Sequence, residues 1–309
     1  MNILIINYTR VGDSVLSTAL INYLINKYPS SRISIVTSTF AQDIFKKMPQ
    51  LENLFVVDKK NFSFHWFKIW KLVIGHTWDL TIDLRSSYLS YLIRTKKNKI
   101  FRGNEHSHKV EQLKRFLNID TLITPKVWID ENDKSKGKSL LKGNGPFIAV
   151  APFSNWPQKD WSLKNYIDLF KNDFFKNYTL LFFGQSKNLK DQGLFDNLIK
   201  LNNIKIYNLF DQFNLREIAG IIDSCNLFIG SDSALMHISA STSCRTIGLF
   251  GPTNDLVYRP WGDGNIVIRA ANSISKKERP DKHKDLGTES LLNGITVEEV
   301  FKRIKEEIA

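Results

Sequence analysis

Residues 226–253 read NLFIGSDSALMHISASTSCRTIGLFGPT and carry the plainest fold signature of the chain. They open with an apolar run, residues 227–230, of the length and composition of a buried strand. The Ser-Asp-Ser that follows predicts a helix start, with Asp232 or Ser231 as N-cap. A second apolar run, residues 246–250, ends in Gly-Pro-Thr. A strand, a helix and a strand in so few residues predict a βαβ unit, and hence a parallel sheet.

The chemistry of this unit is expected at the carboxyl ends of its strands, where parallel sheets bind ligands. The helix start at Ser233 directs free N–H groups and a partial positive charge to that edge. His237 lies one turn into the helix. Asp-Ser before an apolar helix is often only a cap, and a lone histidine is more often structural. The cap, the histidine and the turn at residues 251–253 together favour an anion site, best suited to a diphosphate.

Length and composition indicate an ordinary globular protein. A chain of 309 residues fits two domains, and 42% hydrophobic residues support full cores. The first residues, MNILIINY, predict a strand and lack a signal-peptide pattern. No apolar run is long enough to cross a bilayer. Cys225 and Cys244 lack metal-ligand spacing, so we expect reduced thiols in a cytoplasmic protein.

The net charge of +12 is unevenly distributed. Residues 1–145 contain 23 Lys and Arg against 12 Asp and Glu, whereas residues 146–309 contain 20 against 19. The first half is therefore expected to face an anionic partner, such as a phosphorylated glycolipid, a membrane surface or a nucleic acid. The alternative is a basic surface that only keeps the protein soluble.

The first half opens in a Rossmann-like order. Residues 2–7 predict a strand, a loop follows, a helix begins at Ser14, and residues 32–37 predict the next strand. The motif G-x-G-x-x-G is absent from the chain, which disfavours a redox dinucleotide. Asp13 has two interpretations. It could cap the helix, or it could be a carboxylate at the ligand edge that acts as a general base, with Gly12 leaving room beside it.

Two further segments of the first half are unusual. Residues 61–73, NFSFHWFKIWKLV, are dense in aromatics at helical spacing; a buried helix is the favoured interpretation, and a face that meets lipid is the alternative. A basic patch begins at Arg94 and includes Lys97. Residues 131–145 contain several lysines and three glycines and predict a helix and an interdomain linker. The expected domains therefore span residues 1–143 and 144–309.

The second half repeats the alternation of strands and helices, which predicts a second doubly wound domain closed by a C-terminal helix. Its first strand, residues 146–151, leads into a rigid loop with two tryptophans, residues 152–161. Lys159 is the cation of that loop and can reach the same edge as His237. An ordinary surface lysine is the equally weighted alternative.

Three motifs, spread over nearly the whole chain, carry a family resemblance. They are ILIINYTRVGDSVLSTALINYLINKYP from Ile3, APFSNWPQKDWSLKNY from Ala151, and FIGSDSALMHISA from Phe228 followed by GLFGPT. With these motifs the chain resembles glycosyltransferase family 9, the lipopolysaccharide heptosyltransferases. The resemblance implies a GT-B fold, in which two Rossmann-like doubly wound domains face each other across a cleft. The first would bind mainly the acceptor and the second the nucleotide sugar.

The resemblance also implies a reaction: inverting, metal-independent transfer of a heptose onto a lipopolysaccharide core or lipid A-type acceptor. ADP-heptose is the expected donor, with no cofactor and no nucleic acid partner. Without a metal, the leaving diphosphate needs fixed cations and N–H donors. Asp13 matches the base. The matching donor residues are Ser154, Asn155, Lys159, Asp232, Ser233, Ala234 and His237, and the expected acceptor residues are Arg10, Gly12, Arg94 and Lys97. Such an enzyme would be cytoplasmic, with room for peripheral contact at the inner membrane.

The chain departs from the family pattern at several positions. Ala234 replaces the usual glycine, and Arg10 stands where small hydroxyl residues are common. Gln185-Ser186 offers no acidic partner for a ribose. Two alternatives follow: a transferase of this family that uses another nucleotide sugar, or a non-catalytic protein that binds anionic glycolipids.

Overall fold

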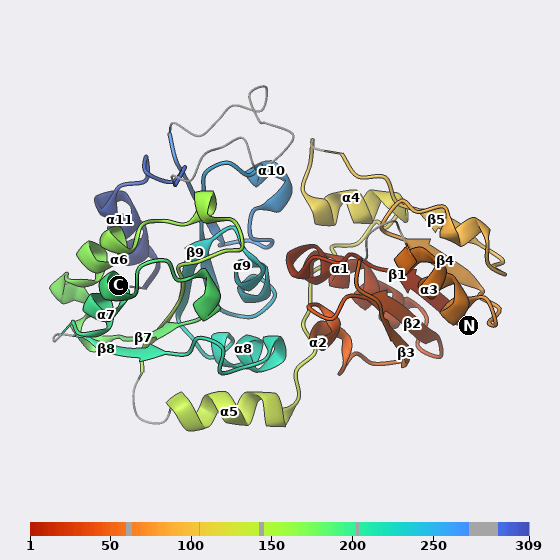
Figure 1. The fold of residues 1–309 in the computed structure, drawn as a ribbon, viewed down its shortest axis with the longest axis horizontal. Coiled ribbons are helices and arrows are strands. Elements are labelled where there is room, and N and C mark those ends of the chain that lie inside the picture. Colours follow the sequence, from red (N-terminus) through yellow and green to blue (C-terminus); the bar gives the residue numbers. More distant parts are fainter. Residues whose placement is uncertain (60–63, 105, 142–144, 202–203, 272–289, 309) are drawn as a thin grey trace. The chain divides into compact units, whose positions relative to one another are not determined.

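The computed structural model describes residues 1–59, 64–104, 106–141, 145–201, 204–271 and 290–308. The chain divides into two compact units, Met1–Asp130 and Glu131–Ala309. Each unit is built on one sheet whose strands are all parallel, with helices beside it (Figure 1). This confirms the predicted pair of Rossmann-like α/β domains. No helix among the described residues has the length and apolarity needed to span a bilayer.

The division falls earlier than the sequence predicted. The expected boundary, between residues 143 and 144, lies outside the described residues, and the structure divides the chain after Asp130. Helix α5 (Glu131–Leu141) packs on α8 (Leu215–Ile222) of the second unit. Arg216 Nε lies 3.0 Å from Asp133 Oδ2, and both side chains are buried. The helix expected in residues 131–145 is therefore confirmed and belongs to the second unit, and residues 142–144 of that segment lie outside the described residues.

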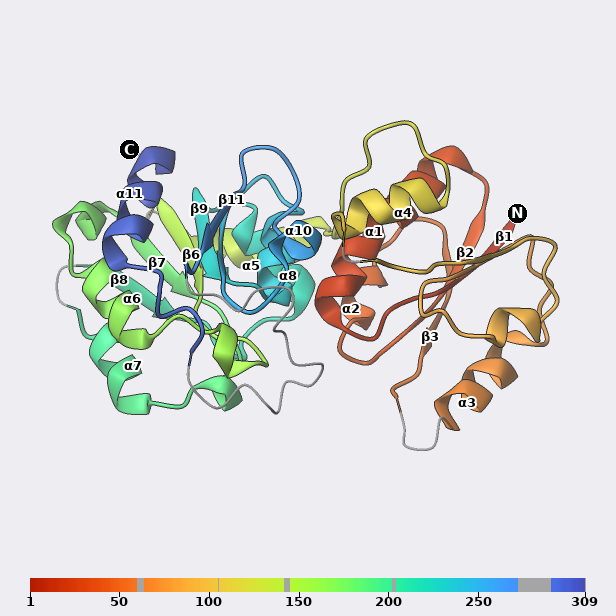
Figure 2. The ribbon, with the colours of Figure 1, turned by 90° about the horizontal axis from the view of Figure 1, so that it is seen from above.

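The sheet of the first unit has the order β3-β2-β1-β4-β5. Its strands are β1 (Asn2–Ile6), β2 (Arg32–Thr37), β3 (Leu51–Val56), β4 (Leu80–Asp83) and β5 (Asn98–Ile100). Its helices are α1 (Val11–Lys27), α2 (Gln42–Phe45), α3 (Phe64–Val73) and α4 (Lys109–Phe116). Helices α1 and α4 lie side by side (Figures 1 and 2). Strand β1 is central and buried along most of its length, which explains its nearly continuous apolar run.

Helix α3 is only partly the buried helix that the aromatic segment predicted. Ile69 and Val73 are fully buried in the core with residues of β1 and β2. Phe64 and Phe67 lie on the opposite side and are 68% and 56% exposed. Residues 61–63 lie outside the described part of the chain.

The sheet of the second unit has the order β11-β10-β9-β6-β7-β8. Its strands are β6 (Phe147–Ala151), β7 (Thr179–Phe182), β8 (Lys205–Asn208), β9 (Leu227–Ser231), β10 (Arg245–Phe250) and β11 (Ile266–Arg269). Its other helices are α6 (Leu163–Phe170), α7 (Gln192–Ile199), α9 (Ala234–Ser239), α10 (Asp255–Tyr258) and α11 (Val297–Ile308). Residues of α6, α7 and α11 pack in one core on one face of the sheet, and residues of α8 and α9 in another core on the opposite face (Figure 2).

One glycine sets the spacing at the centre of this sheet. Gly230 of β9 pairs with Ala151 of β6, and a Cβ at residue 230 would lie 2.6 Å from the Ala151 carbonyl oxygen. Only glycine allows so close an approach. The two strands end side by side, and the loops that follow them carry Lys159 and Asp232. The register of β6 and β9 therefore brings these two residues to one edge.

Candidate functional site

The structure joins three of the predicted residues in one buried cluster at the carboxyl ends of β6 and β9. Lys159 Nζ lies 2.7 Å from Asp232 Oδ2 and 3.3 Å from the Asp232 carbonyl oxygen. His237 Nε2, from the first turns of α9, lies 3.6 Å from Asp232 Oδ1. Asp232 and His237 are buried, and the Lys159 ammonium lies 5.2 Å from the centre of the Trp156 ring. Lys159 is therefore not an ordinary surface lysine.

The charged side chains of this cluster stabilise one another electrostatically. Burial alone would raise the pKa of Asp232, but the charges of Lys159 and His237 and hydrogen bonds from Lys159 and Thr253 outweigh it and lower that pKa. Asp232 is thus a buried carboxylate compensated by fixed cationic partners. An incoming anion would find the same partners at the same edge.

The start of helix α9 differs from the prediction in its cap. The N-cap is Ser233, not Asp232 or Ser231, and its side chain makes no capping hydrogen bond. In the described part of the chain, the buried hydroxyls of Ser231 and Ser233 have no hydrogen-bond partner. Buried hydroxyls are rarely left so, and these two lie beside the Lys159–Asp232 pair. Ala234 is the first residue of the helix, and its methyl group stands where the family pattern has none.

Ser154 and Asn155, which were predicted to bind the donor, follow β6 as expected. The Ser154 hydroxyl donates to the Trp156 carbonyl at 2.7 Å, and the Ser154 N–H donates to Asp160 Oδ1 at 2.8 Å. Ser154 therefore shapes its own loop. Asn155 is exposed, and its Oδ1 accepts a hydrogen bond from Asn188 at 3.3 Å.

Asp160 makes stability depend on pH. Burial raises the pKa of Asp160 from 3.8 to about 7, against hydrogen bonds from Ser154 and the charges of Lys190 and Lys159. The pKa of Asp160 is higher in the folded chain than in the unfolded chain. The contribution of Asp160 to the free energy of unfolding is therefore complete at pH values below the unfolded pKa and is lost as pH rises through about 7. Asp160→Asn keeps an acceptor for Ser154 and stays neutral. We expect its melting temperature to rise relative to that of the native chain between about pH 4 and about pH 8.

Melting curves of both proteins across this range test the prediction. Asp168→Asn, which removes a carboxylate from exposed helix surface, is the matched control. A difference between the Asp160→Asn and native melting temperatures that stays constant with pH would contradict the assignment.

A carboxylate that the sequence analysis missed lies farther along the same edge. Asp211 follows β8, and its Oδ2 accepts a hydrogen bond from the Ser186 N–H at 2.9 Å and another from the Ser186 hydroxyl. These hydrogen bonds lower the pKa of Asp211. An acidic side chain therefore lies beside Gln185-Ser186, but Asp211 supplies it and not the segment itself. The signal was available, because residues 204–209, IKIYNL, have the pattern of a strand and Asp211 follows them closely.

In the first unit, Asp13 does not cap the helix. Helix α1 begins at Val11, three residues before the predicted start; its N-cap is Arg10, and that cap has no side-chain hydrogen bond. Asp13 is a half-buried carboxylate in the first turn of α1, just beyond the carboxyl end of β1. A carboxylate there is favoured by the helix dipole. Arg10 is exposed beside it, and Gly12 is half-buried.

Arg94 and Lys97, which were predicted to bind the acceptor, lie at the opposite edge of this sheet. The Arg94 carbonyl accepts from Trp78 N and the Lys97 carbonyl accepts from Thr81 N, at the amino ends of β4 and β5. Asp13 lies at the carboxyl ends. The structure does not bring Arg94 and Lys97 to it, because they precede strand β5 instead of following it.

A different cation lies near Asp13. Lys109, the first residue of α4, places its ammonium 4.7 Å from the centre of the Tyr8 ring and 4.8 Å from that of Phe101. Burial lowers the pKa of Lys109, and the negative charge of Asp13 opposes that shift. Two aromatic faces hold the cation. Nothing in the local sequence marks Lys109, because its position comes from the packing of α4 on α1.

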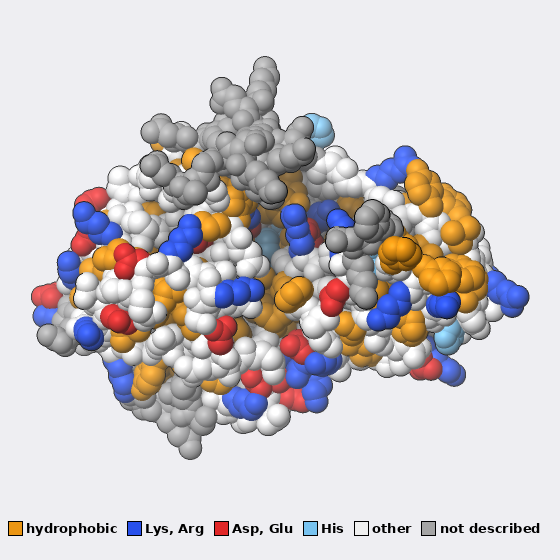
Figure 3. Space-filling view, viewed as in Figure 1, with side chains coloured by type: hydrophobic (Ala, Val, Ile, Leu, Met, Phe, Trp, Pro, Cys, Tyr) orange, Lys and Arg blue, Asp and Glu red, His pale blue; other side chains and the backbone are white. Residues whose placement is uncertain are grey.

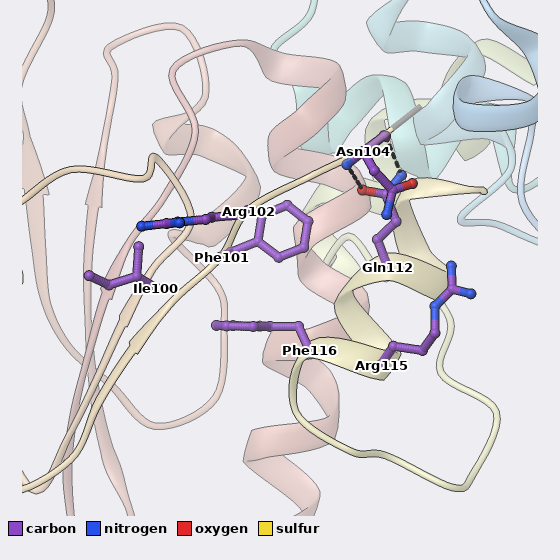
Figure 4. A pocket seen from close by; sticks show the side chains of 7 residues that line it. All are labelled: Ile100, Phe101, Arg102, Asn104, Gln112, Arg115 and Phe116. Carbon is purple, nitrogen blue, oxygen red and sulfur yellow. Dashed lines mark hydrogen bonds between the residues drawn. The ribbon is translucent and has the colours of Figure 1, made fainter. Parts of the chain in front are cut away.

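An open pocket of about 390 Å³ lies between the end of β5 and helix α4 (Figure 4). The Phe101 and Phe116 rings meet edge to face at 5.4 Å, and Gln112 exchanges hydrogen bonds with the backbone of Asn104 at 2.8 and 2.9 Å. The residues that line the pocket are Ile100, Phe101, Arg102, Asn104, Gln112, Arg115 and Phe116. A Cβ at Gly103 would lie 3.3 Å from both Gln112 and Phe101 and 3.4 Å from Lys109 Nζ. A side chain at residue 103 would therefore contact the Lys109 ammonium.

Comparison with known proteins assigns the family. The model of glycosyltransferase family 9 (heptosyltransferase) matches residues 107–286, which is more than half of the chain. The chain belongs to glycosyltransferase family 9. It is therefore a glycosyltransferase, and the resemblance that its motifs indicated is confirmed.

Among the described residues, no group of three His, Cys, Asp or Glu side chains is placed to hold a metal ion.

Similar proteins match nearly the whole length of this family 9 chain. A lipooligosaccharide heptosyltransferase 2 of Campylobacter jejuni is 24% identical over 93% of this chain and 96% of its own length. The crystal structure of a family 9 glycosyltransferase from Veillonella parvula matches with a TM-score of 0.83 and 22% identity over 99% and 96% of the two chains. The Escherichia coli ADP-heptose lps heptosyltransferase II matches with a TM-score of 0.74 and 17% identity over 99% and 98%. The fold is GT-B, with two Rossmann-like units.

Proposed function

We propose that this family 9 enzyme is an inverting heptosyltransferase that moves a heptose from ADP-heptose onto an anionic lipopolysaccharide core or lipid A-type acceptor. The observation that carries the proposal is the buried cluster of Lys159, Asp232 and His237, beside the unpartnered hydroxyls of Ser231 and Ser233. The names of two similar proteins support this choice of donor and product: a lipooligosaccharide heptosyltransferase and an ADP-heptose lps heptosyltransferase.

The donor diphosphate is the group that this cluster suits. As the sugar leaves, negative charge develops on the phosphate oxygen, and a fixed ammonium and fixed hydroxyl donors stabilise it without reorganisation. Lys159 supplies the charge, and Ser231 and Ser233 supply hydrogen bonds. With the protein providing these groups, the transfer needs no metal ion. Asp211 can accept hydrogen bonds from the ribose hydroxyls, as acidic residues do in related parallel sheets.

Asp13 is the base of the proposed reaction. The acceptor oxygen forms a bond to the anomeric carbon as the bond between that carbon and the phosphate oxygen breaks, and the hydroxyl proton passes to Asp13. A single displacement of this kind inverts the anomeric centre. Lys109, whose ammonium interacts with the charge of Asp13, replaces Arg94 and Lys97 as the cation for an anionic group of the acceptor. Such an acceptor is anchored in the inner membrane, where the enzyme would make peripheral contact.

A thermal-shift screen tests the donor assignment. ADP and ADP-heptose are expected to raise the melting temperature, since a ligand at about 100 times its Kd adds about 2.7 kcal/mol of stability. UDP, UDP-N-acetylglucosamine and inorganic phosphate at equal concentration serve as controls. A shift with the UDP compounds alone would favour a family 9 transferase with another donor. No shift with any nucleotide would favour the non-catalytic glycolipid-binding alternative.

A further inference from the structure

The first unit carries a group of exposed apolar side chains that the proposed reaction does not use. They lie on α3 and on the short helix η2 (Leu89–Tyr91) with its flanking residues. Their exposed fractions are 68% for Phe64, 56% for Phe67, 75% for Tyr88, 68% for Tyr91 and 64% for Leu92. We call these five residues the aromatic patch. Figure 3 shows hydrophobic side chains gathered over α3, β4 and β5, with Lys and Arg side chains beside them.

The aromatic patch is held in place by its own contacts. Trp70 Nε1 donates a hydrogen bond to the Leu92 carbonyl at 3.1 Å, which ties α3 to the residue after η2. The Phe67 and Trp70 rings stack at 5.8 Å, and the Tyr88 and Tyr91 rings stack at 6.5 Å. Isolated exposed apolar residues are ordinary, whereas a contiguous group on one surface marks an interaction site.

The segment that carries the aromatic patch is rich in positive charge. Residues 64–102 contain eight Lys and Arg and only two acidic residues, Asp79 and Asp83. Asp79 is paired with Lys96 at 2.7 Å, and Asp83 is fully buried. Lys71 is exposed on α3 and places its ammonium 4.8 Å from the centre of the Phe67 ring. The partner of this surface must therefore accept aromatic rings and attract cations.

We propose that the aromatic patch docks the first unit on an anionic lipid bilayer, with its rings at the level of the head groups and the surrounding Lys and Arg on the lipid phosphates. Aromatic rings prefer this interfacial level. Basic side chains close to an anionic surface add attraction, and the combination gives reversible binding without a spanning helix. The inference rests on the proposed function in one respect, because the proposed glycolipid acceptor is itself located in a membrane.

Sedimentation of the full chain with lipid vesicles tests the docking surface. The native chain is expected to sediment with vesicles that contain phosphatidylglycerol, to stay in the supernatant with pure phosphatidylcholine, and to be released by salt. Phe64→Ser combined with Phe67→Ser is expected to lower the partition coefficient about tenfold or more, from the loss of inserted apolar area. Lys68→Gln combined with Lys71→Gln is expected to weaken binding to the anionic vesicles.

Phe40→Ser is the matched control, because Phe40 is also 68% exposed in the first unit but lies outside the aromatic patch. It should sediment like the native chain. Equal sedimentation of the native chain and the Phe64/Phe67 variant would overturn the proposal, as would a patch-dependent dimer or patch-dependent binding of single-stranded RNA without vesicle binding. The vesicles hold neither donor nor acceptor, so failure here leaves the proposed reaction intact. Transfer to a lipid-free acceptor fragment tests that reaction separately, and the Phe64/Phe67 variant should retain it.

Discussion

Asp13→Asn is expected to lower turnover by about 10²–10⁴-fold, with donor and acceptor both saturating. An acceptor hydroxyl is a poor nucleophile unless a base takes its proton as the new bond forms. Asparagine keeps the size of aspartate but cannot take that proton. The helix should be little affected, because its N-cap is Arg10 and a first-turn carboxylate contributes only about 0.3–1 kcal/mol through the helix dipole. Donor affinity should also be unchanged, because the donor cluster belongs to the second unit.

The control is Asp43→Asn, since Asp43 lies in the first turn of α2 in the same unit and has no role in the proposed reaction. Turnover, ADP affinity and melting temperature are measured for both variants. The base assignment fails if Asp13→Asn turns over at a rate close to that of the native enzyme. A large loss of melting temperature would instead show that Asp13 acts on the fold.

Lys159→Met is expected to weaken ADP binding by about 1–3 kcal/mol, the range for a lost charge-assisted hydrogen bond. The same change leaves the Asp232 carboxylate buried without its closest cation, which lies at 2.7 Å in the native chain. Breaking a buried pair in this way costs about 3–5 kcal/mol of stability. Lys159→Met therefore changes both the ADP affinity and the stability, and the two effects must be measured separately.

A second substitution separates them. Lys159→Met combined with Asp232→Asn removes the unpaired charge, so stability should largely return while ADP affinity stays low. Lys164→Met, at an exposed lysine in the next helix, is the matched control. Calorimetric ADP titrations and melting curves on the three variants give both quantities. Native ADP affinity in both Lys159 variants would remove Lys159 from the donor site.

Most of the architecture followed from local patterns. The central strands β1, β6 and β9 are buried on both faces, so each reads as an apolar run that the sequence shows directly. The strands that were missed, β3 and β11, lie at sheet edges and are half-exposed, and their apolar runs are short: residues 54–57, LFVV, and residues 266–268, IVI. The cluster of Lys159, Asp232 and His237 could be predicted because adjacent parallel strands end at the same edge.

The remaining site residues depend on packing that the sequence does not show. The Lys109 ammonium lies against the rings of Tyr8 and Phe101. Tyr8 is distant from Lys109 in sequence, and neither ring belongs to helix α4. Arg94 and Lys97 were misplaced because closeness to a strand in sequence does not say which end of the strand they flank. The prediction of a buried helix for the aromatic segment was half right. Helical spacing predicts that one face is buried, but it does not show whether other residues cover the opposite face.

The pairing of β6 with β9 also has a consequence for how the second unit folds. Lys159 and Asp232 are 73 residues apart in sequence, and strands β7 and β8 lie between β6 and β9 along the chain. Contacts of such long range require a large loop to close, and they form slowly relative to local ones. The anion site can exist only once the two halves of this sheet have joined. A nucleotide bound there would slow the separation of those halves, and hydrogen exchange along β6 and β9 would report its presence.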